Sequence, residues 1–174
     1  MTDETTPSLE VTAAESVGSS ILTPTKFLVC ADDSEASRVS LRFACIKAKK
    51  RGGLVDILHV VQPADFQSLM GIADRMREEA KQKAEILLAR LSAEARELTG
   101  ITPTILLREG SIGEEVLKAV VEDHGVNMLV LGVTPGPARG KLIAWIASQL
   151  GEQLLIPIML VPGNLTDQQI DELS

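Results

Sequence analysis

The feature that most constrains the fold is a repeated alternation between short apolar segments and longer amphipathic segments. The sequence predicts strands at residues 27–31, 54–61, 101–108, 127–132 and 158–161, and helices at 34–51, 69–98, 112–124 and 140–154. Strict alternation of this kind favours an α/β fold, in which right-handed crossovers place helices on both faces of a parallel sheet. We therefore expect a five-stranded, Rossmann-like parallel sheet, most simply in the order 3-2-1-4-5.

Capping residues and glycines mark the ends of the predicted helices. The side chain of Ser34 or Asp33 is expected to cap the first helix by accepting backbone N–H groups, and Gly52-Gly53 ends it. Gly100 ends the second helix. The apolar stripe predicted for that second helix comprises Ile72, Met76, Ala80, Ala84, Leu87, Leu91, Ala95 and Leu98. Such a stripe is typical of packing against a core.

The chain reads as one domain with an extension at each end. Its 174 residues, 45% of them hydrophobic, are enough for one sizeable core. Residues 1–25 are rich in Thr, Ser, Glu and Pro without a sustained period and are expected to form a flexible extension. Residues 26–162 form the predicted α/β domain, and residues 163–174 an acidic tail in which Thr166 and Gln169 suit a helix cap.

Charge and hydropathy exclude several classes of partner. A net charge of -7 offers no general basic surface for nucleic acid or for an anionic membrane. The apolar runs are far shorter than the ~18 residues of a membrane span, and the polar N-terminus lacks a secretory segment. We therefore expect a cytoplasmic protein. Cys30 and Cys45 are expected to be reduced core thiols, and His59 and His124 have no second ligand at metal-binding spacing.

The predicted topology also places a ligand site. Open α/β sheets bind ligands beyond the C-terminal strand ends where the winding reverses, here between the first and fourth strands. The Asp32 carboxylate can accept hydrogen bonds there, and Arg139 and Lys141 lie near a helix N-terminus that favours anions. A solvated basic loop end remains an alternative for these two cations. Asp33 adds a second negative charge, which either repels phosphates or helps to hold Mg²⁺.

Several segments along the chain match one family in order and spacing. Val29-Cys30-Ala31-Asp32-Asp33-Ser34-Glu35-Ala36-Ser37 resembles the opening strand and turn of universal stress proteins. Further segments resemble the second, third and fourth strand regions of that family: Leu58-His59-Val60-Val61, Arg108-Glu109-Gly110 with Glu114-Glu115-Val116-Leu117, and Leu129-Val130-Leu131-Gly132. The resemblance covers about residues 26–162, nearly the whole predicted domain.

The resemblance implies a nucleotide site. In ATP-binding members the aspartate ending strand 1 contacts the nucleoside, a backbone position on strand 2 meets the adenine, and a glycine-rich loop holds the phosphates. Carried over by position, the resemblance implies Asp32, Val60 and the loop that begins at Gly132 and includes Gly136. The topology adds Ala31 at the end of the first strand, and the predicted start of the last helix adds Arg139, Gly140 and Lys141 as a further route to phosphate. The loop departs from the family pattern, because three residues rather than two separate Gly132 from Gly136.

A second departure affects the expected cofactor, ATP or AMP. Ala144-Trp145 stands where ATP-binding members have Gly-Ser/Thr, which removes phosphate ligands. An indole at that place would also obstruct the triphosphate. The sequence therefore predicts weak or absent ATP binding, with any affinity depending on Asp32 and on Arg139 or Lys141.

The implied function is that of a stress-response regulatory module that binds a nucleotide or small anion and acts through a protein partner the sequence does not identify. No catalytic constellation is visible, since Ser34 has no nearby His to act as a base. The alternatives are an interaction protein with a degenerate site, and a slow ATPase. The resemblance and the apolar strand 158–161 also predict a homodimer through that strand. The competing arrangement has the acidic tail folded back over the strand.

Overall fold

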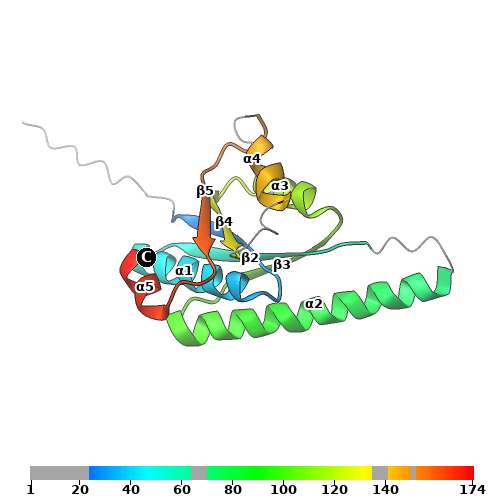
Figure 1. The fold of residues 1–174 in the computed structure, drawn as a ribbon, viewed down its shortest axis with the longest axis horizontal. Coiled ribbons are helices and arrows are strands. Elements are labelled where there is room, and N and C mark those ends of the chain that lie inside the picture. Colours follow the sequence, from blue (N-terminus) through cyan, green and yellow to red (C-terminus); the bar gives the residue numbers. More distant parts are fainter. Residues whose placement is uncertain (1–23, 64–69, 135–140, 150–151) are drawn as a thin grey trace, which may run out of the picture.

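A computed structural model describes residues 24–63, 70–134, 141–149 and 152–174. The described chain forms one parallel sheet between two layers of helices (Figure 1). The strands are β1 (Lys26–Cys30), β2 (Leu54–Val61), β3 (Thr104–Glu109), β4 (Val126–Val133) and β5 (Ile158–Pro162). The helices are α1 (Glu35–Arg51), α2 (Met70–Thr99), α3 (Ile112–Glu122), α4 (Lys141–Gln149) and α5 (Asp167–Leu173). The order is β3-β2-β1-β4-β5 with every pair parallel, which confirms the predicted sheet.

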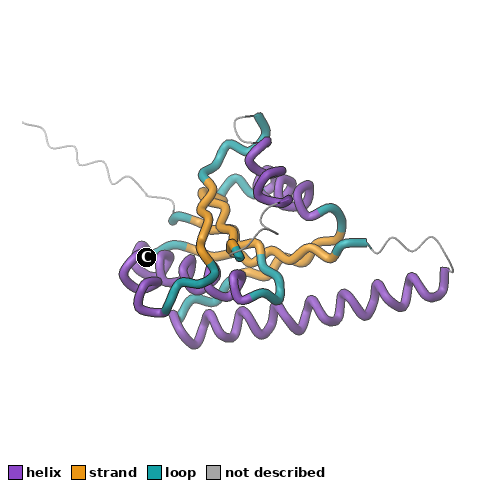
Figure 2. The backbone as a smooth tube through the Cα atoms, viewed as in Figure 1, coloured by secondary structure: helices purple, strands orange, loops and turns teal. Residues whose placement is uncertain are grey.

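Both faces of the sheet are covered, and each has its own core. Helices α1, α2 and α5 lie on one side, and α3 and α4 lie on the other (Figure 2). Neighbouring residues of a strand point to opposite faces, so Phe27 and Val29 of β1 enter the first core while Leu28 enters the second. A central strand buried on both faces has no polar alternation, which explains the continuous apolar run in the sequence.

The first helix begins and ends where the sequence indicates. Ser34 is its N-cap, and the Ser34 side chain accepts a hydrogen bond from the Ser37 backbone N–H. Gly52 ends the helix with φ 65, a left-handed conformation that glycine adopts without a Cβ penalty. The position of this cap matters for the site, because it places the first turn of α1 beside the end of β1.

Three predicted boundaries differ from the structure by two residues or more, whereas several others differ by a single residue. Strand β3 begins at Thr104 rather than Ile101, since Pro103 has no N–H for the ladder. Helix α3 ends at Glu122, where the Asp123 side chain accepts the Gly125 N–H and turns the chain. Helix α4 ends at Gln149 rather than Leu154. Leu154 lies instead in the core beneath α3 and α4.

The apolar stripe predicted for α2 is only partly buried. Its buried members are Ala84, Leu91 and Ala95. Met76 and Leu98 are 40% and 57% exposed, whereas Leu88, outside the predicted stripe, is 1% exposed. Figure 1 shows that the N-terminal end of α2 extends beyond the sheet, so that end has no core to face. No helix within the described ranges is both long enough and apolar enough to cross a membrane.

The C-terminal residues form a short helix that docks on α1. Thr166 and Gln169 make the predicted capping box at its start. Ile170 is buried in the core beneath α1, and Arg42 of α1 forms a salt bridge of 2.6 Å with Asp167. Among the described residues this tail adds no strand to β5, whose ladder is with β4.

Candidate functional site

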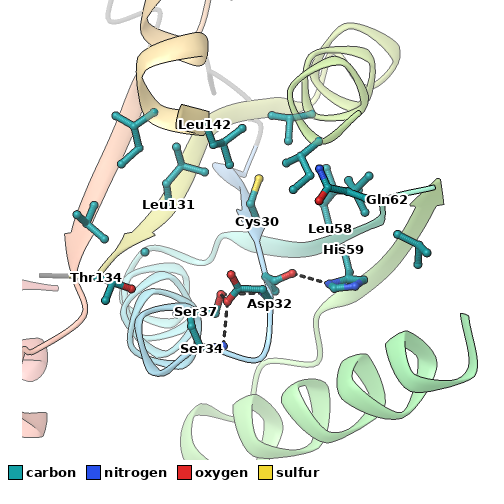
Figure 3. Close-up of a pocket in the computed structure, with 18 of the residues that line it drawn as sticks. Cys30, Asp32, Ser34, Ser37, Leu58, His59, Gln62, Leu131, Thr134 and Leu142 are labelled. Carbon is teal, nitrogen blue, oxygen red and sulfur yellow. Dashed lines mark hydrogen bonds between the residues drawn. The ribbon is translucent and has the colours of Figure 1, made fainter. Parts of the chain in front are cut away.

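A cavity of about 590 Å³ opens at the C-terminal ends of β1, β2 and β4 (Figure 3). This is where the winding of the sheet reverses, and the volume lies within the usual range for small-molecule sites. One part of the lining is apolar and comprises Leu58, Val60, Ile112, Val116, Leu131 and Leu142. The other part is polar and comprises Asp32, Ser34, Ser37, His59, Gln62 and Thr134. A flat apolar ring with a polar appendage would match both parts.

Asp32 is held rigidly at the end of β1. Its Oδ1 accepts hydrogen bonds from the Ser34 backbone N–H at 2.9 Å and from Ser37 Oγ at 2.7 Å. Ser37 Oγ also accepts the Asp32 backbone N–H at 2.8 Å. No described residue donates to Asp32 Oδ2, so that oxygen is available to a ligand in the cavity.

The same contacts keep the Asp32 carboxyl ionised. Partial burial by itself would raise the pKa of Asp32, but the hydrogen bonds from Ser34 and Ser37 outweigh it and hold that pKa below its usual value. The site therefore presents a fixed carboxylate at neutral pH. A fixed carboxylate can accept hydrogen bonds from hydroxyl or amino groups.

Replacing Ser37 with alanine is expected to raise the pKa of Asp32, because the carboxylate loses a charge-assisted donor. A lowered folded-state pKa contributes stability above the unfolded-state value of 3.8, and this contribution is lost as the pH falls through the folded-state pKa. In Ser37→Ala this contribution should therefore be smaller, and its loss should be complete at a higher pH than in the wild type. The titration can be followed by the ¹³C carboxyl shift of Asp32. Ser40→Ala is the matched control, since Ser40 Oγ donates to the Ser37 carbonyl and not to Asp32; equal shifts in both variants would contradict the prediction.

Asp33 does not line the cavity. Its carboxylate is exposed and pairs with Arg90 of α2 at 2.5 Å. This pairing offsets the negative charge of Asp33 and draws the side chain toward α2. The geometry therefore gives no support to the idea that Asp32 and Asp33 hold Mg²⁺ together.

The backbone of Val60 faces the cavity side of β2. Ala31 N–H donates to the Leu58 carbonyl at 2.8 Å, whereas Gly110 N–H donates to the Val61 carbonyl at 3.0 Å. Backbone groups of successive strand residues point to opposite neighbours, so Val60, like Leu58, directs its N–H and C=O toward β1. Because β1 ends at Cys30, the N–H and C=O of Val60 face the cavity beyond the end of that strand.

Gly132 lies where β4 passes beneath the first turn of α1. A Cβ at this position would overlap the Ala36 carbonyl and approach the Ser37 nitrogen to 3.0 Å. The absence of a side chain thus allows close packing of α1 on β4. This packing supports the turn that carries Asp32 and Ser37.

The structure brings half of the predicted site residues to one cavity. Ala31, Asp32, Val60 and Gly132 all line it. Lys141 begins α4, the helix whose residues Leu142 and Ile143 also line the cavity. Three further predicted residues lie outside the described ranges: Gly136, Arg139 and Gly140.

Trp145 does not occupy the cavity. Its indole packs against Gly113 of α3, where a Cβ would overlap the ring, and it joins the core beneath α3 and α4. Ala144 is exposed and is also absent from the lining. The expectation that the indole obstructs the ligand position is therefore wrong, because Gly113 provides a flat surface between the two helices.

Sequence reasoning missed several residues of the lining, chiefly Ser37 and His59. Ser37 lies three residues after the Ser34 cap, a spacing that turns its hydroxyl back toward the end of β1. No local signal marks His59. Cys30 lines the cavity, but burial and the nearby Asp32 charge raise the pKa of its thiol to about 12. This thiol is protonated at neutral pH and is a poor nucleophile.

Comparisons with known proteins agree with the fold. The model of the universal stress protein family matches residues 24–162. Universal stress protein UspA from Lactobacillus plantarum shares the fold with a TM-score of 0.68 at 14% identity, covering 79% of this chain and 97% of that one. An Arabidopsis thaliana family protein with AMP bound gives 0.55 at 17% identity, with 80% and 92% covered. The Archaeoglobus fulgidus protein in complex with dAMP gives 0.58 at 17% identity, with 80% and 98% covered.

A search of curated proteins finds no significant match. The family model nevertheless spans most of the chain, from just before β1 to the end of β5. The order of the sheet and the position of the cavity follow from the same stretch of sequence. This chain therefore belongs to the universal stress protein family.

Proposed function

We propose that the cavity binds an adenine nucleotide and that the protein is a regulatory module acting through a partner rather than by catalysis. The observation that carries the proposal is the pair of Val60 backbone groups facing the cavity beside the apolar wall. Adenine presents an acceptor at N1 next to a donor at N6, which complements an N–H and a C=O of one strand residue. Guanine presents a donor at N1 and an acceptor at O6. In the same orientation its N1 donor would face the Val60 N–H and its O6 acceptor would face the Val60 C=O, so neither hydrogen bond could form.

Asp32 supports a nucleoside rather than a free base. Its ionised carboxylate, with Oδ2 available, lies at the end of the neighbouring strand and can accept hydrogen bonds from ribose hydroxyls. The relatives solved with AMP and with dAMP are consistent with this ligand class. The ligand proposed for this chain is therefore an adenosine phosphate.

The phosphate-binding part of the site favours one phosphate over three. The described lining contains no Lys or Arg, so phosphate binding depends on Arg139 and Lys141 near the start of α4. Ala144 and Trp145 supply neither the glycine nor the hydroxyl that ATP-binding members place here. We therefore expect AMP to bind more tightly than Mg-ATP.

Titration calorimetry tests this proposal directly. AMP should bind the wild type, GMP and Mg-ATP should bind more weakly, and Asp32→Ala should lower the AMP affinity at least about tenfold, because charge-assisted hydrogen bonds are lost. Asp33→Ala is the matched control, since Asp33 pairs with Arg90 outside the cavity, and it should change the affinity less than about twofold. Submicromolar Mg-ATP binding would refute the phosphate argument. Unchanged AMP affinity in Asp32→Ala would show that AMP does not bind in this cavity beside Asp32.

We also propose that the protein is a homodimer joined through β5. This strand is at one edge of the sheet, and the C-terminal helix α5 packs on α1 instead of pairing with it. Leu129 N–H donates to the Pro157 carbonyl and Gly163 N–H donates to the Val133 carbonyl. By alternation along the strand, Ile158 and Leu160 direct their backbone groups outward. An apolar edge with outward N–H and C=O groups favours antiparallel pairing with a second copy about a two-fold axis.

A further inference from the structure

The end of the β1–β2 ladder contains one hydrogen bond that does not follow the parallel pattern. In a parallel pair, a residue that donates to position i of its neighbour normally accepts from position i+2. Ala31 donates to the Leu58 carbonyl, so the Ala31 carbonyl would be expected to accept the Val60 N–H. That bond is not formed. The Ala31 carbonyl instead lies 2.7 Å from Nδ1 of His59 (Figure 3).

The chemistry of this contact fixes the protonation of the ring nitrogen. A carbonyl oxygen only accepts hydrogen bonds, so Nδ1 of His59 must carry the proton. This holds for the neutral ring and for the imidazolium, because both can have a proton on Nδ1. A carbonyl oxygen can accept two hydrogen bonds, yet among the described residues only His59 donates to the Ala31 carbonyl oxygen.

We infer that His59 is a positioning residue of this site, holding the Ala31 carbonyl in a side-chain hydrogen bond so that the Val60 N–H stays open to a ligand. Without the imidazole, the Ala31 carbonyl would accept the Val60 N–H and extend the β1–β2 ladder by one hydrogen bond. The Val60 N–H would then be unavailable to a ligand. This inference deepens the proposed function and rests on it, because the acceptor that Val60 would meet is N1 of adenine. His59 need not touch the ligand to act in this way.

Two isosteric substitutions separate the donor from the shape of the ring. Asparagine places an amide N–H₂ near the position of Nδ1, whereas leucine has the same branched shape without a donor. Amide hydrogen exchange at Val60, measured by NMR without ligand, should be fast in the wild type and in His59→Asn. It should be slowed at least about tenfold in His59→Leu, because a ladder hydrogen bond forms. AMP affinity should stay within about threefold in His59→Asn and fall at least about tenfold in His59→Leu.

The wild type alone also tests the inference, whether or not His59→Leu folds. A long-range NMR experiment that detects coupling across hydrogen bonds should connect His59 Nδ1, and not Val60 N, with the Ala31 carbonyl carbon. A correlation from Val60 N to that carbon would overturn the inference, as would unchanged Val60 exchange in His59→Leu. If the wild type binds no adenine nucleotide, the proposed function fails, while the ligand-free exchange and coupling measurements still decide the role of His59.

Discussion

Replacing Gly132 with alanine is expected to lower the melting temperature by about 10 °C. The added Cβ would overlap the Ala36 carbonyl, which belongs to the backbone of α1 and cannot rotate away. Relief therefore requires a shift of α1 relative to β4, and overpacking of this kind costs about 3 kcal/mol. For a domain of this size each kcal/mol lowers the melting temperature by about 2–4 °C. Calorimetry or circular dichroism can measure the change.

Gly52→Ala is the matched control for this substitution. Gly52 has φ 65, and a Cβ there would meet no atom within 4 Å. Alanine at that position thus carries a conformational penalty of about 1 kcal/mol without a clash, which corresponds to about 3 °C. A Gly132→Ala protein that melts within about 2 °C of the wild type would show that α1 and β4 are not in tight contact.

Replacing Leu160 with proline is expected to weaken the proposed dimer about 30-fold. The Leu160 N–H points away from β4, so proline removes a donor at the outer edge and leaves the β4–β5 ladder in place. By two-fold symmetry the change removes two hydrogen bonds per dimer, about 2 kcal/mol in total. Leu160→Lys should act in the same direction, because the side chain is 48% exposed and a charge would lie at the seam. Sedimentation equilibrium measures the dissociation constants.

Ile86→Lys controls for the loss of an exposed apolar side chain. Ile86 is 70% exposed on α2, away from the edge of the sheet, and the substitution should leave dimerisation unchanged. A monomeric wild type would refute the proposed dimer outright. A dimer that persists undiminished in both Leu160 variants would place the interface on another surface.

Many features of the fold were predictable because they depend on local pattern. The apolar run at Phe27–Ala31 predicts a strand buried on both faces, and the Ser34 cap and Gly52 predict the limits of α1. The capping box of Thr166 and Gln169 was likewise predictable, because the two residues stand three positions apart in the sequence. The end of α4 was not, because Leu154 continues the four-residue spacing of Leu142, Ile146 and Leu150 in the sequence, yet Leu154 lies outside the helix and packs into the core.

The candidate site was predictable only in part. Asp32, Val60 and Gly132 follow from the topology and the family resemblance, since both point to the ends of β1, β2 and β4. Trp145 was misplaced because its partner is Gly113, more than a helix away in sequence and without a side chain to signal the contact. The long stripe of α2 was overestimated because the periodicity of a helix does not reveal where the sheet beneath it ends.

The sequence by itself determined the parallel sheet, its order and the edge at which the cavity lies, because burying both faces of a sheet demands alternating apolar strands and amphipathic helices. Only the tertiary structure decided which polar groups meet at that edge. Ser37 reaches back to Asp32, Arg90 draws Asp33 away, and His59 engages the Ala31 carbonyl. Each of the last two contacts joins residues far apart in the chain, so it depends on the relative positions of packed elements and leaves no periodic trace in the sequence.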